Sequence, residues 1–148
     1  MSLIIRPVAP SDETAWATLY AGYAAFYKVP QDDEMRQRVF GWLMDPDHAC
    51  NGLVAQQDDG TLIGLTHYRP FSSPLRACQN CFLDDLFVDP EARGSGAADA
   101  LIHGVAEDAR KRGWGMVRWI TADDNYRGRG VYDKLATRTA WVVYDMKT

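Results

Sequence analysis

Residues 84–109 constrain the fold most, because they join an apolar strand, a glycine-rich loop and a long amphipathic helix. Past Ala98, apolar residues recur at the spacing of one helix face: Leu101, Ile102, Val105, Ala106 and Ala109. Gly94 and Gly96 precede this helix without side chains, so backbone N–H groups and the positive end of the helix dipole are accessible. Arg93 adds a positive charge. The pattern predicts a binding site for an anion the size of pyrophosphate.

Two common phosphate-binding motifs do not fit this loop. A nucleoside-triphosphate loop requires Gly-Lys-Ser/Thr, but Ala97 and Ala98 follow Gly96. A dinucleotide GxGxxG/A motif that started at Gly94 would end on Asp99. That motif also normally opens the first strand–helix unit of its fold, whereas this loop lies well past mid-chain. Both nucleotide interpretations therefore fail.

The loop instead resembles the acetyl-coenzyme A loop of the GNAT N-acetyltransferase superfamily, whose pattern is Arg/Gln-x-x-Gly-x-Gly/Ala. Arg93, Gly96 and Ala98 occupy its three fixed positions. The resemblance implies that acetyl-CoA binds the loop and the strand before it, with strand N–H groups polarising the thioester carbonyl. The cofactor-binding residues that it implies here are Leu86, Phe87, Val88, Arg93, Gly94, Ser95, Gly96, Ala97 and Ala98.

A second motif at residues 125–135 is similar to the GNAT segment Asn-x-x-Ala-x-x-Leu/Phe-Tyr-x-Lys-Leu-Gly. The resemblance implies that Asn125 contacts the pantetheine arm and that Tyr132 protonates the leaving thiolate. The two residues are two helical turns apart and should share a helix face; without the motif, Tyr132 would be interpreted as a packing residue. Gly128 replaces the usual Ala, Gly130 follows it, and Ala136 replaces the final Gly. Interior glycines weaken a helix by about 1 kcal/mol each, so we expect a short, kinked or mobile helix.

Two adjacent carboxylates are candidates for the general base that amine acylation requires. Residues 82–88 resemble a segment of the diamine N-acetyltransferases in which the first carboxylate is the base, which implies Asp84 here, directly or through a water. On a regular strand, Asp84 and Asp85 would point to opposite faces. The alternative is that both merely cap or solvate the strand.

An acidic run, residues 32–34, lies between the first two expected helices. We expect Asp32 and Asp33, together with Asp85, to bind substrate by attracting a cation. We expect Tyr27, Trp42 and Tyr68 to add cation–π contacts beside this acidic path. The alternative is that the run complements the dipole of a helix N-terminus.

Periodicity and turn residues predict the remaining elements. Strands are expected at residues 3–6, 53–55, 62–68, 81–88, 115–121 and 139–144, with a loop at residues 69–79. Helices are expected from residue 13 to about 27, from 32 to 44, from 98 to 112, and from 125 to about 135. This order predicts an α/β fold, a mixed central sheet with helices on both sides, and agrees with the GNAT acyl-CoA acyltransferase fold. We expect one domain, residues 1–148.

Composition narrows the class of protein. The net charge of −4 disfavours a nucleic-acid partner, and no apolar run approaches the roughly 20 residues of a membrane span. Three cysteines form no even disulfide framework, which suits a cytoplasmic location. His48, Cys50, Cys78 and Cys81 could supply zinc ligands, but the His48–Cys50 spacing is too short for the usual zinc knuckle. We expect no metal.

We therefore predict an acetyl-CoA-dependent N-acetyltransferase that acts on a primary amine, preferably a small cationic one such as a polyamine or a lysine-like amino acid. Asp84 would be its base and Tyr132 its acid, and no covalent enzyme intermediate is required. Acetylation of a protein lysine or N-terminus and a non-catalytic acyl-CoA-binding module remain as alternatives. Homodimer formation is left open.

Overall fold

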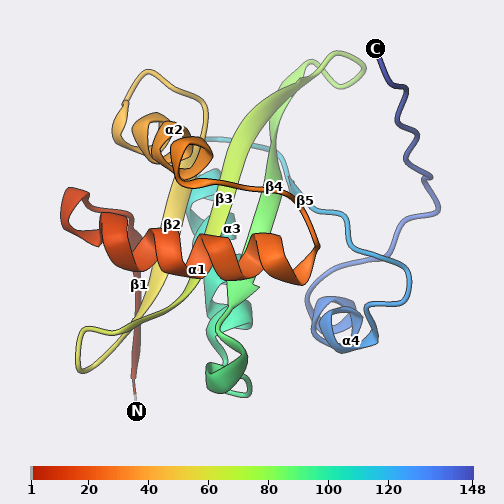
Figure 1. The fold of residues 1–148 in the computed structure, drawn as a ribbon. Helices are drawn as coiled ribbons and strands as arrows, with labels where there is room; N and C mark the ends of the chain where they lie inside the picture. Colours follow the sequence, from red (N-terminus) through yellow and green to blue (C-terminus); the bar gives the residue numbers. More distant parts are fainter. Residues whose placement is uncertain (1) are drawn as a thin grey trace.

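The computed structural model describes residues 2–148 and contains one sheet with the strand order β1–β2–β3–β4–β5 (Figure 1). The strands are β1 (Leu3–Pro7), β2 (Asn51–Gln57), β3 (Leu62–Ser73), β4 (Cys78–Val88) and β5 (Val117–Arg118). The first four strands pair antiparallel, and β4 pairs with β5 in parallel. The predicted mixed sheet is confirmed.

Helices cover both faces of this sheet. They are α1 (Glu13–Phe26), α2 (Asp33–Met44), α3 (Ala97–Lys111) and α4 (Tyr126–Leu135), with short 3-10 turns η1 (Pro10–Asp12) and η2 (Pro90–Ala92). Figure 1 shows α1 and α2 on one face and α3 on the other, while α4 lies beyond β5. Each face has its own core, in which Trp16 and Leu65 lie on the α1 side and Leu101 and Val105 on the α3 side.

The pairing of β3 with β4 shifts register at the two carboxylates. His67 lies opposite Asp85 but Tyr68 lies opposite Leu83, so Asp84 is an extra residue, a β-bulge. Side-chain packing changes phase at this point. The residues that pack into the α3-side core are Cys81 and Leu83 before the bulge and Leu86 and Val88 after it.

The expected opposite orientation of Asp84 and Asp85 is therefore wrong. Asp85 bonds to Tyr20 of α1, and Asp84 bonds to Arg69 of β3, two positions along the strand from His67. Both carboxylates lie on the α1 face of the sheet. A bulge cannot be predicted from strand alternation, because alternation is the pattern that it interrupts.

Two further predictions are corrected. The expected loop at residues 69–79 is mostly strand, because β3 continues to Ser73 and β4 begins at Cys78. The expected last strand at residues 139–144 does not form, and residues 136–148 carry no regular secondary structure. Despite Gly128 and Gly130, α4 is one continuous helix that ends at Leu135.

Candidate active site

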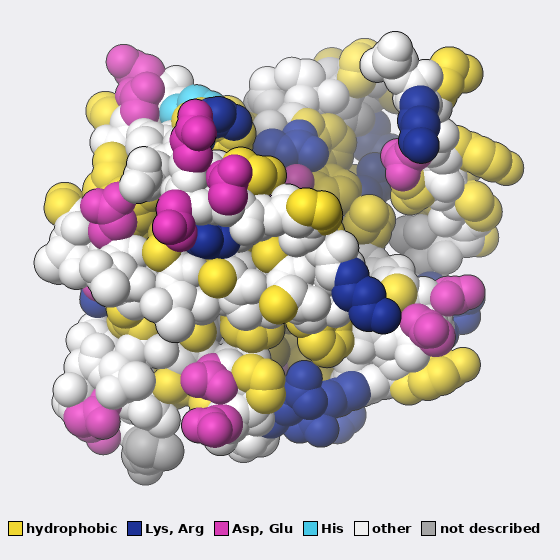
Figure 2. Space-filling view, in the orientation of Figure 1, with side chains coloured by type: hydrophobic (Ala, Val, Ile, Leu, Met, Phe, Trp, Pro, Cys, Tyr) yellow, Lys and Arg dark blue, Asp and Glu magenta, His cyan; other side chains and the backbone are white. Residues whose placement is uncertain are grey.

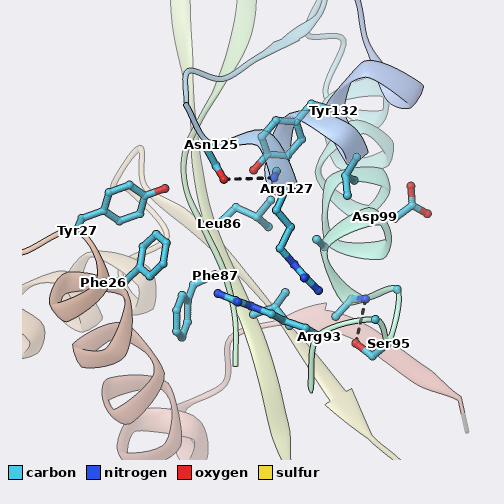
Figure 3. Close-up of a pocket in the computed structure, with 17 residues that line it drawn as sticks. Phe26, Tyr27, Leu86, Phe87, Arg93, Ser95, Asp99, Asn125, Arg127 and Tyr132 are labelled. Atoms are coloured by element: carbon cyan, nitrogen blue, oxygen red, sulfur yellow. Dashed lines mark hydrogen bonds between the residues drawn. The ribbon is translucent and has the colours of Figure 1, made fainter. Parts of the chain in front are cut away.

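A pocket of about 470 Å³ opens where the C-terminal end of β4, the glycine-rich loop and α4 meet, with the end of α1 as its far wall (Figure 3). All residues predicted to contact the cofactor line it: Leu86, Phe87, Val88, Arg93, Gly94, Ser95, Gly96, Ala97, Ala98, Asn125 and Tyr132. Phe26 and Tyr27 of α1, which the motifs did not indicate, line it as well. The fold thus brings two motifs that are distant in sequence to one cavity.

The glycine-rich loop has the geometry of an anion cradle. Gly94 and Gly96 both have φ of +82°, a left-handed conformation that strongly favours glycine, and a Cβ at either position would meet no atom within 4 Å. Ser95 Oγ accepts a bond from Ala97 N–H, whereas the N–H groups of Gly96 and Ala98 have no partner within residues 2–148. Unpartnered amides at the start of α3 fit the pyrophosphate of coenzyme A.

Two arginines line the pocket, one from each side. Arg93 follows η2, and Arg127 belongs to the first turn of α4. Figure 3 shows both side chains extending into the pocket, and Figure 2 shows Lys and Arg side chains gathered between the loop and α4. Sequence reasoning missed Arg127, because a short run of basic residues on a helix usually marks a solvated helix end.

Asn125 lines the pocket but also serves its own helix. Its Oδ1 accepts the N–H of Gly128 at 3.2 Å and its Nδ2 donates to Thr121 Oγ1 at 2.9 Å, so it is the N-cap of α4. A Cβ at position 128 would lie 2.5 Å from Asn125 Nδ2. The departure from the family's Ala at this position is therefore what permits this cap.

Tyr132 stands on α4 two turns beyond Asn125, and both residues line the pocket as their spacing predicts. Its ring packs edge-on against Trp119, with ring centroids 5.5 Å apart. Burial raises the pKa of the Tyr132 hydroxyl, and nearby Tyr27 raises it further. The hydroxyl is consequently protonated at neutral pH, which is the state that an acid requires.

Asp85 is held by a chain of buried hydrogen bonds. Trp16 Nε1 donates to His67 Nε2 at 3.0 Å; since an indole can only donate, His67 carries its proton on Nδ1 and donates it to Asp85 Oδ2 at 2.8 Å. Tyr20 Oη also donates to Asp85 Oδ2, at 2.9 Å. Burial opposes ionisation of Asp85, but the bonds from His67, Tyr20 and Tyr23 outweigh it and lower its pKa.

Asp84 lies in a different environment from its neighbour. Its side chain is 33% exposed. Its two carboxylate oxygens accept hydrogen bonds from Arg69 Nε, at 3.0 Å for Oδ2 and 3.2 Å for Oδ1. Burial nevertheless raises the pKa of Asp84 above its ordinary value, although Arg69 lowers it, and the charge of Asp85 contributes to the increase. Of the two carboxylates, Asp84 is therefore the stronger base.

The acidic run lies at the start of α2, away from the pocket. Asp32 caps that helix by accepting the N–H of Met35 at 2.8 Å, and Asp33 pairs with Arg36 at 2.7 Å. Asp33 lines a groove between α1 and α2 together with Glu13. The helix-terminus alternative thus accounts for the local contacts of the run, and its role in substrate binding stays a prediction.

Of the three aromatic residues proposed for cation–π contacts, only Tyr27 lines the pocket. Tyr68 is 2% exposed and donates to Asp108, and Trp42 stacks on His48. Tyr68 therefore belongs to the core and cannot receive a substrate. Within residues 2–148, no cluster of three potential metal ligands occurs, and no helix is long and apolar enough to cross a membrane.

The chain belongs to the acetyltransferase (GNAT) family, whose pattern matches residues 16–136. It is 29% identical over 143 residues to the D-amino-acid N-acetyltransferase HPA3 of Saccharomyces cerevisiae, covering 96% of this chain and 89% of that protein. It is 35% identical over 60 residues to the thialysine N-epsilon-acetyltransferase of Bos taurus, covering 40% of this chain and 35% of that protein.

Solved structures share the fold. A ribosomal-protein-alanine N-acetyltransferase from Brucella melitensis biovar Abortus 2308 superposes with a TM-score of 0.82 at 24% identity over the whole of both chains. The aminoglycoside acetyltransferase AAC(6')-Iy, in complex with a bisubstrate analogue of coenzyme A, superposes with a TM-score of 0.86 at 19% identity, covering 100% of this chain and 99% of that one. The predicted enzyme class, an acetyl-CoA-dependent acyltransferase, is confirmed.

Proposed function

We propose that the protein transfers the acetyl group of acetyl-CoA to the amine of a small cationic molecule, with Asp84 as base and Tyr132 as acid. The observation that carries this proposal is the pocket, in which the glycine-rich loop, the end of β4 and Tyr132 meet. Asp84 and Asp85 do not line this pocket but lie on the same strand, just before Leu86. Acetyl-CoA, when bound, supplies the activated acetyl group.

Residues of the loop, of α4 and of β4 would hold the cofactor. Gly96 and Ala98 offer amides to the pyrophosphate, with Arg93 and Arg127 as counter-charges. Within residues 2–148, β5 pairs with β4 only at Cys81 and Phe82, so no strand of this part of the chain occupies that side of β4 beyond them. An extended ligand could pair there, and the backbone could polarise its carbonyl.

The acceptor must lose a proton before it can attack. An amine with a pKa near 10.4 is about 0.04% neutral at pH 7, so a base contributes directly to the rate. Asp84 accepts this proton, directly or through a water, while Asp85 stays ionised and attracts the cation. Tyr132 returns a proton to the departing sulfur.

A small amine is favoured over a protein acceptor by the similarity to two enzymes whose names describe small amino-acid substrates, one a D-amino acid and the other thialysine. The similarity to the second of these enzymes covers only 60 residues, 40% of this chain. We therefore propose an amino acid or polyamine with a free primary amine as the acceptor class.

An amine screen tests this function. Release of free thiol from acetyl-CoA would be measured with polyamines, L- and D-amino acids, lysine analogues, neutral amines and a lysine-containing peptide. Polyamines, lysine analogues or amino acids should react best, and the apparent affinity of a cationic acceptor should weaken as ionic strength rises. A peptide or a neutral amine as the best acceptor would contradict the proposal.

The cofactor site has its own test, independent of the acceptor. Arg127→Gln should weaken coenzyme A binding about tenfold in a calorimetric titration, because it removes a charge-assisted contact. Arg129→Gln is the matched control, since Arg129 lies on the same helix, bonds to the backbone of Asp123 and is not in the pocket. Equal affinities of the two variants would remove Arg127 from the site.

A further inference from the structure

The face of the sheet that carries Asp84 is covered by α1 only in part. His67 of β3 is 2% exposed, because the rings of Trp16 and Tyr20 of α1 pack on it. Two positions further along β3, on the same face, the side chain of Arg69 is 44% exposed. Figure 1 shows the β3–β4 hairpin extending beyond α1 in this direction. Arg69 therefore lies at the solvent side of the candidate base.

Arg69 is oriented by two neighbours. Its Nε donates to both carboxylate oxygens of Asp84, and its guanidinium carbon lies 5.0 Å from the centroid of the Phe82 ring. Phe82 is opposite Arg69 in the β3–β4 register, and Phe71 packs edge-on against it with ring centroids 6.3 Å apart. The carboxylate holds one edge of the guanidinium, and the aromatic ring holds its plane.

The other edge of this guanidinium is open to an anion. Nη1 and Nη2 of Arg69 donate to no group of residues 2–148. Arg118 of β5 lies opposite Phe82, with its guanidinium 5.9 Å from the centroid of Phe71, and it forms no ion pair within the described part of the chain. A planar fork of N–H donors matches the two oxygens of a carboxylate. The surface beside the base thus suits an acceptor that carries a carboxylate.

We propose that Arg69 binds the carboxylate of an α-amino acid while the α-amine of the same molecule lies at Asp84, so that amino acids are preferred to polyamines as acceptors. This inference rests on the proposed function. The amine and the carboxylate of an α-amino acid are attached to one carbon, as are Nε and the Nη atoms of a guanidinium, so the two arrays are similar in span. A polyamine offers no anion to Arg69 and places a cation beside it instead.

The transfer balances without a further reactant. The α-ammonium group gives one proton to Asp84, and its nitrogen lone pair then forms the N–C bond to the acetyl carbon. The C–S bond breaks with its electron pair on sulfur, and Tyr132 protonates that sulfur. The second proton lost by the nitrogen returns to the Tyr132 oxygen, and Asp84 releases its own proton to solvent. Arg69 transfers no proton and determines which acceptor is held.

Pairs of acceptors that differ by the carboxylate test this role. Release of thiol from acetyl-CoA would be measured with phenylalanine and phenethylamine, and with lysine and cadaverine, using both enantiomers of each amino acid. Arg69→Gln should lower kcat/KM for the amino acids about 10- to 100-fold relative to their decarboxylated partners, through KM. Arg69→Lys, which keeps the charge but not the fork, should fall in between. The substitution also removes an interaction that lowers the pKa of Asp84, but that change affects both members of a pair.

Arg76→Gln is the matched control, since Arg76 is exposed in the turn between β3 and β4 and loses the same charge. It should keep the wild-type ratio within each pair, and coenzyme A affinity should be unchanged in every variant, because Arg69 does not line the cofactor pocket. A wild-type ratio in Arg69→Gln would overturn the proposal. Activity on polyamines alone would also overturn it and leave the proposed function intact, whereas no thiol release with any amine would reject both.

Lysine adds a test within one molecule, because it carries two primary amines. Mass spectrometry of the product should locate the acetyl group on the α-amine. Acetylation of the ε-amine would place the carboxylate away from Arg69, and would contradict this proposal while it supported the proposed function.

Discussion

At the scale of residues, the site contrasts two carboxylates that are neighbours in sequence. Asp85 is tied to His67 and Tyr20, its pKa is lowered, and its oxygens are largely committed. Asp84 is more exposed, forms an ion pair with Arg69, and has a raised pKa. Adjacent groups whose environments separate their basicities are a common basis for dividing catalytic roles.

Asp84→Asn should abolish the acid limb of the pH–rate profile. In the wild type, kcat/KM should fall as the pH decreases through the raised pKa of Asp84, because the base becomes protonated. The variant should be slower by about 10²- to 10⁴-fold near neutral pH and recover as alkali supplies the neutral amine. Asp85→Asn should keep the acid limb but move it to lower pH, because its charge helps to raise the pKa of Asp84. The opposite pattern would make Asp85 the base.

Tyr132→Phe should lower kcat by a similar factor while coenzyme A affinity changes little, since the ring and its packing against Trp119 are retained. Steady-state kinetics combined with calorimetric titration of coenzyme A would separate the two effects. Unchanged turnover would assign the proton donor to water or to another group.

At the scale of elements, the absence of a side chain at Gly128 affects how the helix α4 is capped. Asn125 can cap α4 because position 128 has no Cβ. Gly130 has no such neighbour, since a Cβ there would meet nothing within 4 Å. The glycine at position 128 therefore has a packing reason that the glycine at position 130 lacks.

Alanine substitutions at these two positions should differ in their effect on stability. Gly130→Ala should stabilise the protein by up to about 1 kcal/mol, because it improves helix propensity without a clash. Gly128→Ala should gain less or destabilise, because it displaces the Asn125 cap, which is worth about 1 kcal/mol. Chemical denaturation of both variants measures the difference; equal stabilisation would show that the cap is unimportant.

The elements also show what sequence can and cannot predict. The α3 helix and its loop were predictable because five apolar positions and two glycines specify them locally. The position of Arg127 in the pocket was not, since it depends on how α4 docks beside the loop. The bulge at Asp84 was missed because it arises from pairing with β3, and the segment at residues 139–144 has strand composition without a strand beside it in the same chain.

At the scale of the whole molecule, buried carboxylates link folding to pH. Asp12 is 8% exposed and pairs with Arg6 at 2.7 Å, which joins β1 to the start of α1. The bond from Arg6 lowers the pKa of Asp12 below its ordinary value, against the effect of burial. Asp85 has a lowered pKa as well.

Stability should therefore decrease in acid. A carboxyl whose folded-state pKa is lowered stabilises the fold above its unfolded pKa, near 3.8, and loses that contribution as the pH falls through the folded value. Asp12→Asn should cost about 1–3 kcal/mol at pH 7 and flatten the decrease below pH ~4. Urea denaturation at several pH values, with Asp145→Asn as an exposed control, would measure both effects. An unaltered pH slope in Asp12→Asn would rule out this linkage.

The bulge in β4 also decides which side of the sheet the side chains after it face. One extra residue reverses the alternation of side chains between the two faces of the sheet. With Asp84 in the strand, Leu86 and Val88 therefore face the α3 side only because of the bulge. Deleting Asp84 should therefore remove the carboxylate and the bulge together, while Asp85 and Phe87 keep their present side of the sheet. A regular β4 that kept Asp84 would instead turn Phe87, which now packs toward α1, to the opposite side. The bulge thus lets β4 carry a candidate base without reversing the half of the strand that lines the pocket.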